Sequence, residues 1–150
     1  MFEKSFVHRL TKVLIDVMFY IGILIVVALP FITERATGFF GYDESSITLY
    51  TIVLFLSGLC TLYILWQLKA IFRSLLGGDP FIHTNVSCFR KIGVASFVIA
   101  LIYVAKCFLL FSLTSVAFVI VFALAGLFCL TLKDVFKQAI DYKAENDWTV

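Results

Sequence analysis

Charged residues are scarce in this sequence. They make up only 15% of its 150 residues, whereas 62% are hydrophobic, and the mean hydropathy is +1.04. Soluble domains usually contain about 25% charged and about 45–50% apolar residues. In water such a chain would expose too much apolar surface, so lipid must be its solvent. This composition excludes a soluble enzyme, a secreted disulfide scaffold and a disordered polar protein.

Motifs of catalysis and metal binding are missing as well. The sequence has no G-x-S-x-G, H-E-x-x-H or P-loop pattern. The four cysteines are Cys60, Cys88, Cys107 and Cys129. Because none of them has C-x-x-C spacing, we interpret them as small apolar core residues rather than as a metal or redox site. His8 and His83 lie far apart, without clustered Cys, Asp or Glu partners. We therefore expect no enzyme activity, no cofactor and no metal site.

Long polar segments are also absent, because four apolar runs occupy most of the chain. A helix needs about 20 apolar residues to cross a hydrocarbon core about 30 Å thick. The runs cover residues 13–32, 47–68, 92–113 and 116–132. No segment shows the alternation of apolar and polar residues that is typical of the strands of an outer-membrane barrel. The segment 69–91 is too short for a separate domain. The sequence therefore predicts an all-α polytopic membrane protein, a single domain of four transmembrane helices over residues 1–150.

Basic residues are distributed unevenly around these runs. All of the 12 Lys and Arg residues except Arg35 and Lys106 lie in residues 1–12, 69–91 and 133–150. Because basic loops stay in the cytoplasm, both termini and the middle segment are predicted to be cytoplasmic. A net charge of +2 is too small to indicate binding to nucleic acid. Contact with anionic membrane lipid accounts for the basic face.

Two ionisable side chains, Asp16 and Lys106, lie within the apolar runs. Charges there are costly and raise the question of a proton or ion pathway. The two residues lie at opposite depths, so we expect Asp16 to pair with Lys12 or with a basic residue of the segment 69–91. Lys106 is expected to snorkel to the outer headgroups. These structural roles are favoured, and a small transporter or channel subunit using Asp16 and Lys106 is the alternative.

The middle segment is predicted to form a helical hairpin with its tip at residues 77–80. Gly77-Gly78 should end the second helix, since glycine accepts the left-handed conformation. Asp79 is then expected to be the N-cap of the third helix, with Pro80 at its first position. We expect Phe81 to insert toward the bundle and Asn85 to hydrogen-bond a backbone group across the hairpin. Turn chemistry alone accounts for all of these residues except Asn85.

The last run continues as a charged helix into a distinctive tail. Its final residues are Glu145, Asn146, Asp147, Trp148, Thr149 and Val150. The last three are apolar and prone to form a strand. They are candidates to fold back on the hairpin or to extend a partner's sheet, and fraying is the alternative.

Small residues mark two further features. Ser57-x-x-x-Thr61 and Ser96-x-x-x-Ala100 have the spacing that lets helices approach closely, within the chain or in a homo-oligomer. The turn between the last two runs is expected to be made by residues that can also cap helix ends. These are Ser112, Thr114 and Ser115.

The hairpin and the tail resemble a known family. Gly78-Asp79-Pro80-Phe81, then Asn85, then Phe89-Arg90-Lys91-Ile92-Gly93 resembles the "G-N/D-P-F … N … L-R-x-I-G" stretch of the DUF2975 family. Residues 144–150 are similar to that family's "E-N-D-L-T-I" terminus, with Trp148 and Val150 in place of Leu and Ile. The resemblance implies a small bacterial integral membrane protein without an established activity. Members are often encoded beside a very small helix-turn-helix regulator.

These observations lead to a functional hypothesis. The protein is expected to lie in the bacterial inner membrane and to be a binding or regulatory component. It would engage a cytoplasmic partner, such as a transcriptional regulator, through the hairpin tip and the tail. Trp148 would be its apolar anchor, because buried aromatic residues commonly dominate interfaces. The expected binding residues are Asp79, Pro80, Phe81, Asn85 and residues 145–150.

Overall fold

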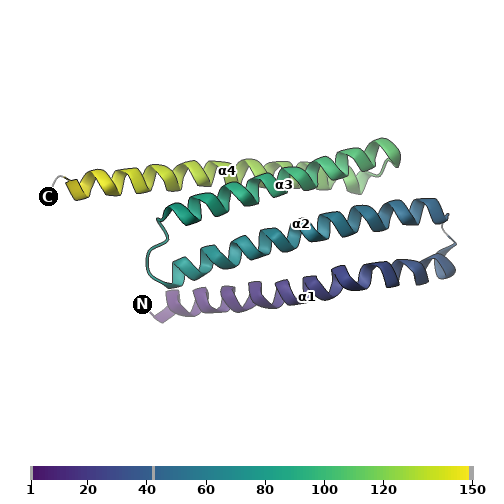
Figure 1. Ribbon diagram of the computed structural model, residues 1–150, viewed down its shortest axis with the longest axis horizontal. Coiled ribbons are helices and arrows are strands. Elements are labelled where there is room, and N and C mark those ends of the chain that lie inside the picture. Colours follow the sequence, from purple (N-terminus) through teal and green to yellow (C-terminus); the bar gives the residue numbers. More distant parts are fainter. Residues whose placement is uncertain (1, 42, 149–150) are drawn as a thin grey trace.

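The computed structural model describes residues 2–41 and 43–148 and consists of four α-helices (Figure 1). They are α1 (Phe2–Phe40), α2 (Glu44–Leu76), α3 (His83–Leu109) and α4 (Leu113–Trp148). Each helix is long and apolar enough to cross a membrane. The prediction of an all-α protein with four such helices is therefore confirmed.

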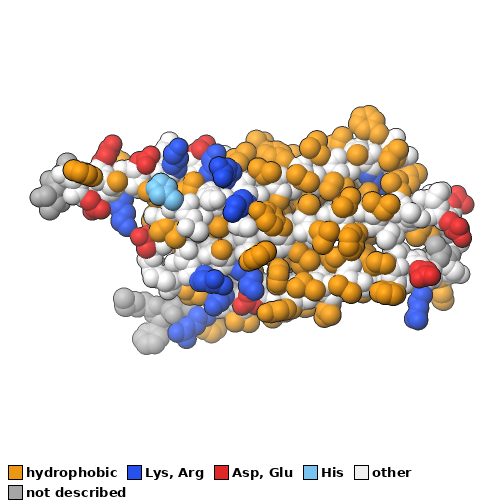
Figure 2. Space-filling model, in the orientation of Figure 1, with side chains coloured by type: hydrophobic (Ala, Val, Ile, Leu, Met, Phe, Trp, Pro, Cys, Tyr) orange, Lys and Arg blue, Asp and Glu red, His pale blue; other side chains and the backbone are white. Residues whose placement is uncertain are grey.

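The helices run side by side along the long axis of the molecule, each packed on its neighbour in the sequence (Figure 1). Among the described residues, only the pairs α1–α2, α2–α3 and α3–α4 bring their Cα atoms within 8 Å of each other. The start of α1 and the end of α4 lie with the α2–α3 connection at one end of the molecule. Lys and Arg side chains gather there, beside a broad apolar band (Figure 2). We call this the basic end.

Glycines lie at close contacts between helices. A Cβ atom on Gly58 of α2 would lie 2.7 Å from Val26 Cγ2 of α1. A Cβ atom on Gly93 of α3 would lie 3.2 Å from the backbone oxygen of Gly126 in α4. Both distances leave little or no room for a side chain, so these helices approach each other where a side chain is missing.

The predicted small-residue pairs Ser57-x-x-x-Thr61 and Ser96-x-x-x-Ala100 lie beside these glycine contacts. Ser57 and Ser96 are buried, but each hydroxyl donates to a carbonyl of its own helix. The Ser57 Oγ lies 2.6 Å from the oxygen of Val53, and the Ser96 Oγ lies 2.9 Å from the oxygen of Ile92. These hydroxyls are thereby satisfied without a bond to the next helix.

The α3–α4 turn begins earlier than expected. Residues 110–112 separate the two helices, and the Ser112 carbonyl accepts the Val116 N–H at 3.2 Å. The prediction that Thr114 and Ser115 belong to this turn is wrong. Both lie in the first turn of α4, because the Ser112 carbonyl already accepts the first helical bond.

Candidate functional site

The hairpin tip is shaped by a side chain that accepts a backbone hydrogen bond. Gly78 has φ +101°, the left-handed conformation expected after α2. The Asp79 carboxylate accepts the Phe81 N–H at 3.1 Å, which forms an Asx turn. The prediction that Asp79 caps α3 and that Pro80 opens it is wrong, because α3 begins at His83. The Asx turn holds residues 79–81 outside the helix.

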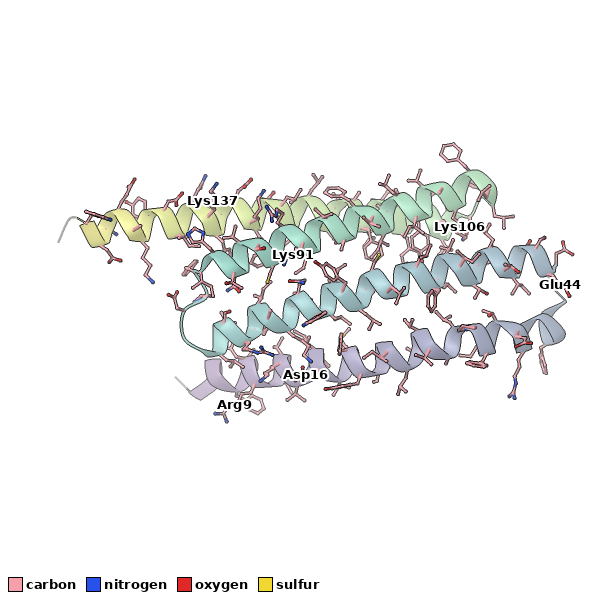
Figure 3. The ribbon with its side chains drawn as sticks, in the orientation of Figure 1. Arg9, Asp16, Glu44, Lys91, Lys106 and Lys137 are labelled. Carbon is pink, nitrogen blue, oxygen red and sulfur yellow. The ribbon has the colours of Figure 1, made fainter. Side chains whose placement is uncertain are left out.

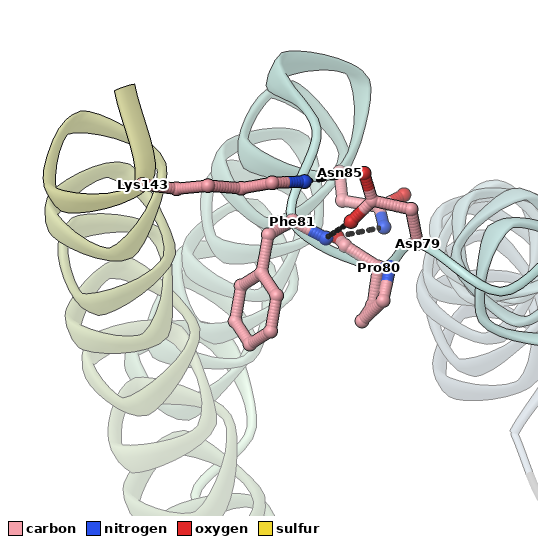
Figure 4. A network of polar contacts seen from close by, with 5 residues as sticks. All are labelled: Asp79, Pro80, Phe81, Asn85 and Lys143. Carbon is pink, nitrogen blue, oxygen red and sulfur yellow. Dashed lines mark hydrogen bonds and ion pairs between the residues drawn. The ribbon is translucent and has the colours of Figure 1, made fainter. Parts of the chain in front are cut away.

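Asn85 holds this turn against the start of α3. Its Nδ2 donates to the Pro80 carbonyl at 2.6 Å, and the side chain is fully buried (Figure 4). The expected bond to a backbone group is therefore present, but its acceptor lies in the tip just before α3 rather than across the hairpin on α2. Its Oδ1 accepts no hydrogen bond from any residue that the structure describes.

The hairpin tip packs against α4. The Lys143 Nζ lies 3.0 Å from Asp79 Oδ2 (Figure 4). The Phe136 ring lies between two rings of the hairpin, with its centroid 5.2 Å from that of Phe81 and 4.9 Å from that of Phe89. Phe81 is still 43% exposed, so it packs on the tail helix rather than inserting into the bundle. We call residues 77–89 together with residues 133–148 the tip–tail unit.

Phe136 and Lys143 were not among the expected site residues. Phe136 is a large apolar residue in the charged part of α4, and this was the signal in the sequence. Its two partners come from the hairpin, which a helical pattern along α4 does not identify.

The tail continues as a helix. α4 extends to Trp148, so the prediction that the chain leaves the helix for a strand at Trp148 is wrong. Thr149 and Val150 lie outside the described residues. Residues 145–147 are exposed, and Trp148 is 89% exposed. The structure therefore brings the hairpin tip together with α4 at Phe136 and Lys143, and leaves the end of the helix uncovered.

The ion pair at the tip makes a prediction about pH. Lys143, and then the Phe81 N–H, hold the pKa of Asp79 below its usual range. Because the pKa is lowered in the folded state, the contact contributes to the free energy of unfolding at neutral pH. This contribution is lost as the pH falls through that pKa. Lys143→Gln should raise the pKa of Asp79, though not fully, because the Phe81 N–H remains. Carbon NMR of the Asp79 carboxyl group during an acid titration measures this.

Lys137→Gln is the matched control for this titration. It removes the same charge from the exposed part of the same helix, and it should leave the Asp79 titration close to that of the unaltered chain. Equal titration curves in the Lys143→Gln and unaltered chains would contradict the ion pair.

Asp16 is paired near the basic end. The Lys69 Nζ lies 3.1 Å from Asp16 Oδ1, which is one of the two pairings that we expected. The same ammonium lies 4.7 Å from the centre of the Phe19 ring and 5.4 Å from that of Tyr20. The pair joins α1 to α2 and compensates the charge of Asp16 within the chain.

Lys106 lies toward the opposite end from Asp16, so the structure does not bring the two together (Figure 3). Its Nζ donates to the Ser115 Oγ at 2.6 Å and lies 4.5 Å from the centre of the Tyr50 ring. Lys106 is 6% exposed and Ser115 is 1% exposed. The expectation that Lys106 snorkels is therefore wrong, because a hydroxyl and an aromatic face hold the ammonium inside the bundle.

A groove of about 330 Å³ lies between the helices and is lined by residues of all four. Its lining is predominantly apolar, with Ser57 and Thr61 among its few polar side chains. Asp16 and Lys106 do not line it. Within residues 2–41 and 43–148, no group of three His, Cys, Asp or Glu side chains is placed to hold a metal ion.

Comparison with known proteins identifies a family. The family model described as "Protein of unknown function (DUF2975)" matches residues 13–150, which include both the hairpin and the tail. No curated protein and no solved structure matches the chain.

Proposed function

We propose that this chain, which belongs to the DUF2975 family, is a membrane-anchored binding component. The proposal rests on the tip–tail unit. The chain engages a cytoplasmic protein, and a small transcriptional regulator is the first partner to test. The role is one of binding rather than catalysis. The family description assigns no function, so the proposal depends on the geometry of this chain.

The proposed orientation places the basic end in the cytoplasm of a bacterium, with the four helices in the inner membrane. The unequal distribution of Lys and Arg supports this orientation. The α4 residues after Leu132 would then extend about 24 Å beyond the apolar run, at about 1.5 Å per residue. A cytoplasmic protein could reach this helix without entering the membrane.

The observation that carries the proposal is the attachment of the hairpin tip to α4. Asp79 holds Lys143, and Phe136 packs on two aromatic rings of the hairpin. These contacts fix one surface from two distant parts of the chain. On that surface Tyr142 is 69% exposed and Trp148 is 89% exposed. Large aromatic side chains on a rigid support are suited to anchor a partner.

The proposal is tested by photo-crosslinking in intact cells. A photoreactive phenylalanine analogue replaces Trp148 in one chain and Phe111, which is 77% exposed in the α3–α4 turn, in a control chain. We expect an adduct with a soluble protein from position 148 and none from position 111. That protein should then copurify with the unaltered chain, and Trp148→Ala should reduce its recovery by about tenfold or more, as loss of an interface anchor does.

Two further variants separate the tip from the tail. Phe81→Ala should weaken the adduct formed at position 148, whereas Phe111→Ala should not, when both chains reach the membrane in equal amounts. If position 148 captures no protein, or if Phe81→Ala and Phe111→Ala give equal yields, the tip–tail unit is not a docking surface.

A further inference from the structure

Positive charge converges in a hollow at the basic end. A cavity of about 300 Å³ lies between the start of α3 and α4. Its polar lining consists of His83, Ser87, Arg90, Lys133, Asp134 and Lys137. Lys133 Nζ lies 3.5 Å from Asp134 Oδ1, which leaves two cations unmatched by acidic residues of this lining. Figure 3 labels Lys137 on α4, on this half of the molecule.

This cavity lies at the edge of the apolar band. Arg90 precedes the apolar run that begins at Ile92, and Lys133 directly follows Leu132 at the end of another run. The phosphate groups of lipids lie at this boundary between hydrocarbon and water. The cations of the cavity are therefore at the depth of lipid headgroups, and Figure 2 shows Lys and Arg side chains bordering the band there.

An apolar groove begins beside the same arginine. This second cavity, of about 440 Å³, lies between α2 and α3. Arg90 and Lys91 line it along with Leu59, Tyr63, Val94 and Val98. Arg90 thus lines both cavities, so cationic groups lie next to an apolar channel. This combination matches a molecule with an anionic head and a hydrocarbon chain.

We propose that the two cavities together bind one anionic phospholipid. Arg90, Lys133 and Lys137 hold its phosphodiester, to which the guanidinium of Arg90 offers two parallel N–H groups. Ser87 offers a hydroxyl to the same headgroup. One acyl chain lies in the groove between α2 and α3. Lys133 and Lys137 also belong to the tip–tail unit, but this inference does not rest on the docking of a cytoplasmic protein, because its ligand is a lipid at the membrane boundary.

The test uses the full chain purified in a neutral detergent, with native mass spectrometry to count bound lipids. The probes are dioleoylphosphatidylglycerol, dioleoylphosphatidylcholine and inorganic phosphate. We expect one phosphatidylglycerol to be retained at about tenfold lower lipid concentration than phosphatidylcholine. The reason is that the choline cation of phosphatidylcholine compensates the charge of its phosphate. Inorganic phosphate lacks the acyl chain and should not compete at similar concentrations.

The variants compare equal changes of charge. Arg90→Gln, Lys133→Gln and Lys137→Gln together should weaken phosphatidylglycerol binding by about tenfold or more. The matched control is Arg9→Gln, Lys12→Gln and Arg73→Gln, three exposed positions outside both cavities, and it should stay within about twofold of the unaltered chain. Circular dichroism must show equal helix content in both.

A second variant tests the groove without touching the cations. Val98→Trp should fill the apolar channel and also reduce retention of phosphatidylglycerol. Equal binding of the two lipids, equal losses in the two triple variants, or competition by inorganic phosphate at similar concentrations would each overturn the proposal. If the triple variant in the cavity does not fold, unchanged lipid retention in Val98→Trp would overturn it.

Discussion

Replacing Gly58 by leucine is expected to separate α1 from α2. Even the first carbon of the new side chain would lie 2.7 Å from Val26 Cγ2, closer than two carbon atoms can pack. Val26 is buried and branched at Cβ, so it has little freedom to move away. Overpacking of this kind costs about 1–3 kcal/mol, and the larger leucine should reach the upper part of that range.

Reversible unfolding in mixed micelles measures this effect. Gly38→Leu is the matched control, because a Cβ on Gly38 meets no atom within 4 Å. It should leave the free energy of unfolding unchanged or raise it slightly, since leucine favours the helix over glycine. The milder Gly58→Ala should be rescued by Val26→Ala, which removes the opposing methyl groups. Equal stability of Gly58→Leu and Gly38→Leu would contradict the close contact.

The second large effect is expected at Ser115. Ser115→Ala removes the hydroxyl that accepts a hydrogen bond from the buried Lys106 ammonium at 2.6 Å. A hydrogen bond to a charged group contributes about 1.5–3 kcal/mol, and the orphaned group then carries the cost of its lost hydration. Lys106→Met should instead be neutral or stabilising, because replacing a buried charge by an apolar side chain of similar volume avoids that cost.

The double variant gives the sharper test. In a Lys106→Met chain, Ser115→Ala should cost far less than it does in the unaltered chain, because no ammonium remains to be orphaned. Ser96→Ala is the control, since Ser96 is equally buried but bonds only to its own helix. An equal cost of Ser115→Ala in both backgrounds would show that the two side chains are not coupled.

The four helices were predictable because a membrane-spanning length is a property of composition alone. The runs 13–32, 47–68 and 116–132 lie inside α1, α2 and α4. The run 92–113 continues past the end of α3 at Leu109, because Leu110 and Phe111 are as apolar in the turn as in the helix. Hydropathy therefore places the helices but does not place the turns between them.

The site was less predictable, because it depends on contacts between distant segments. The sequence singled out Asp79, Phe81 and Asn85, and turn statistics assigned Asp79 to a helix cap. The carboxylate of Asp79 instead accepts the Phe81 N–H and pairs with the Lys143 ammonium. The pair with Lys143 requires α4 to lie beside the hairpin. The position of Phe136 between two rings depends on the same packing. The snorkelling of Lys106 was predicted wrongly for a similar reason, since Ser115 and Tyr50 belong to other helices.

The packing of each helix on its sequence neighbours has a consequence for how the protein is made. A chain leaves the ribosome from its N-terminus, and its early segments fold before the later ones exist. Here α2 can pack on α1 as soon as it is made, α3 can pack on α2, and α4 can pack on α3. Among the described residues, each later helix packs on the one synthesised just before it, so the molecule can be assembled in the order of its synthesis.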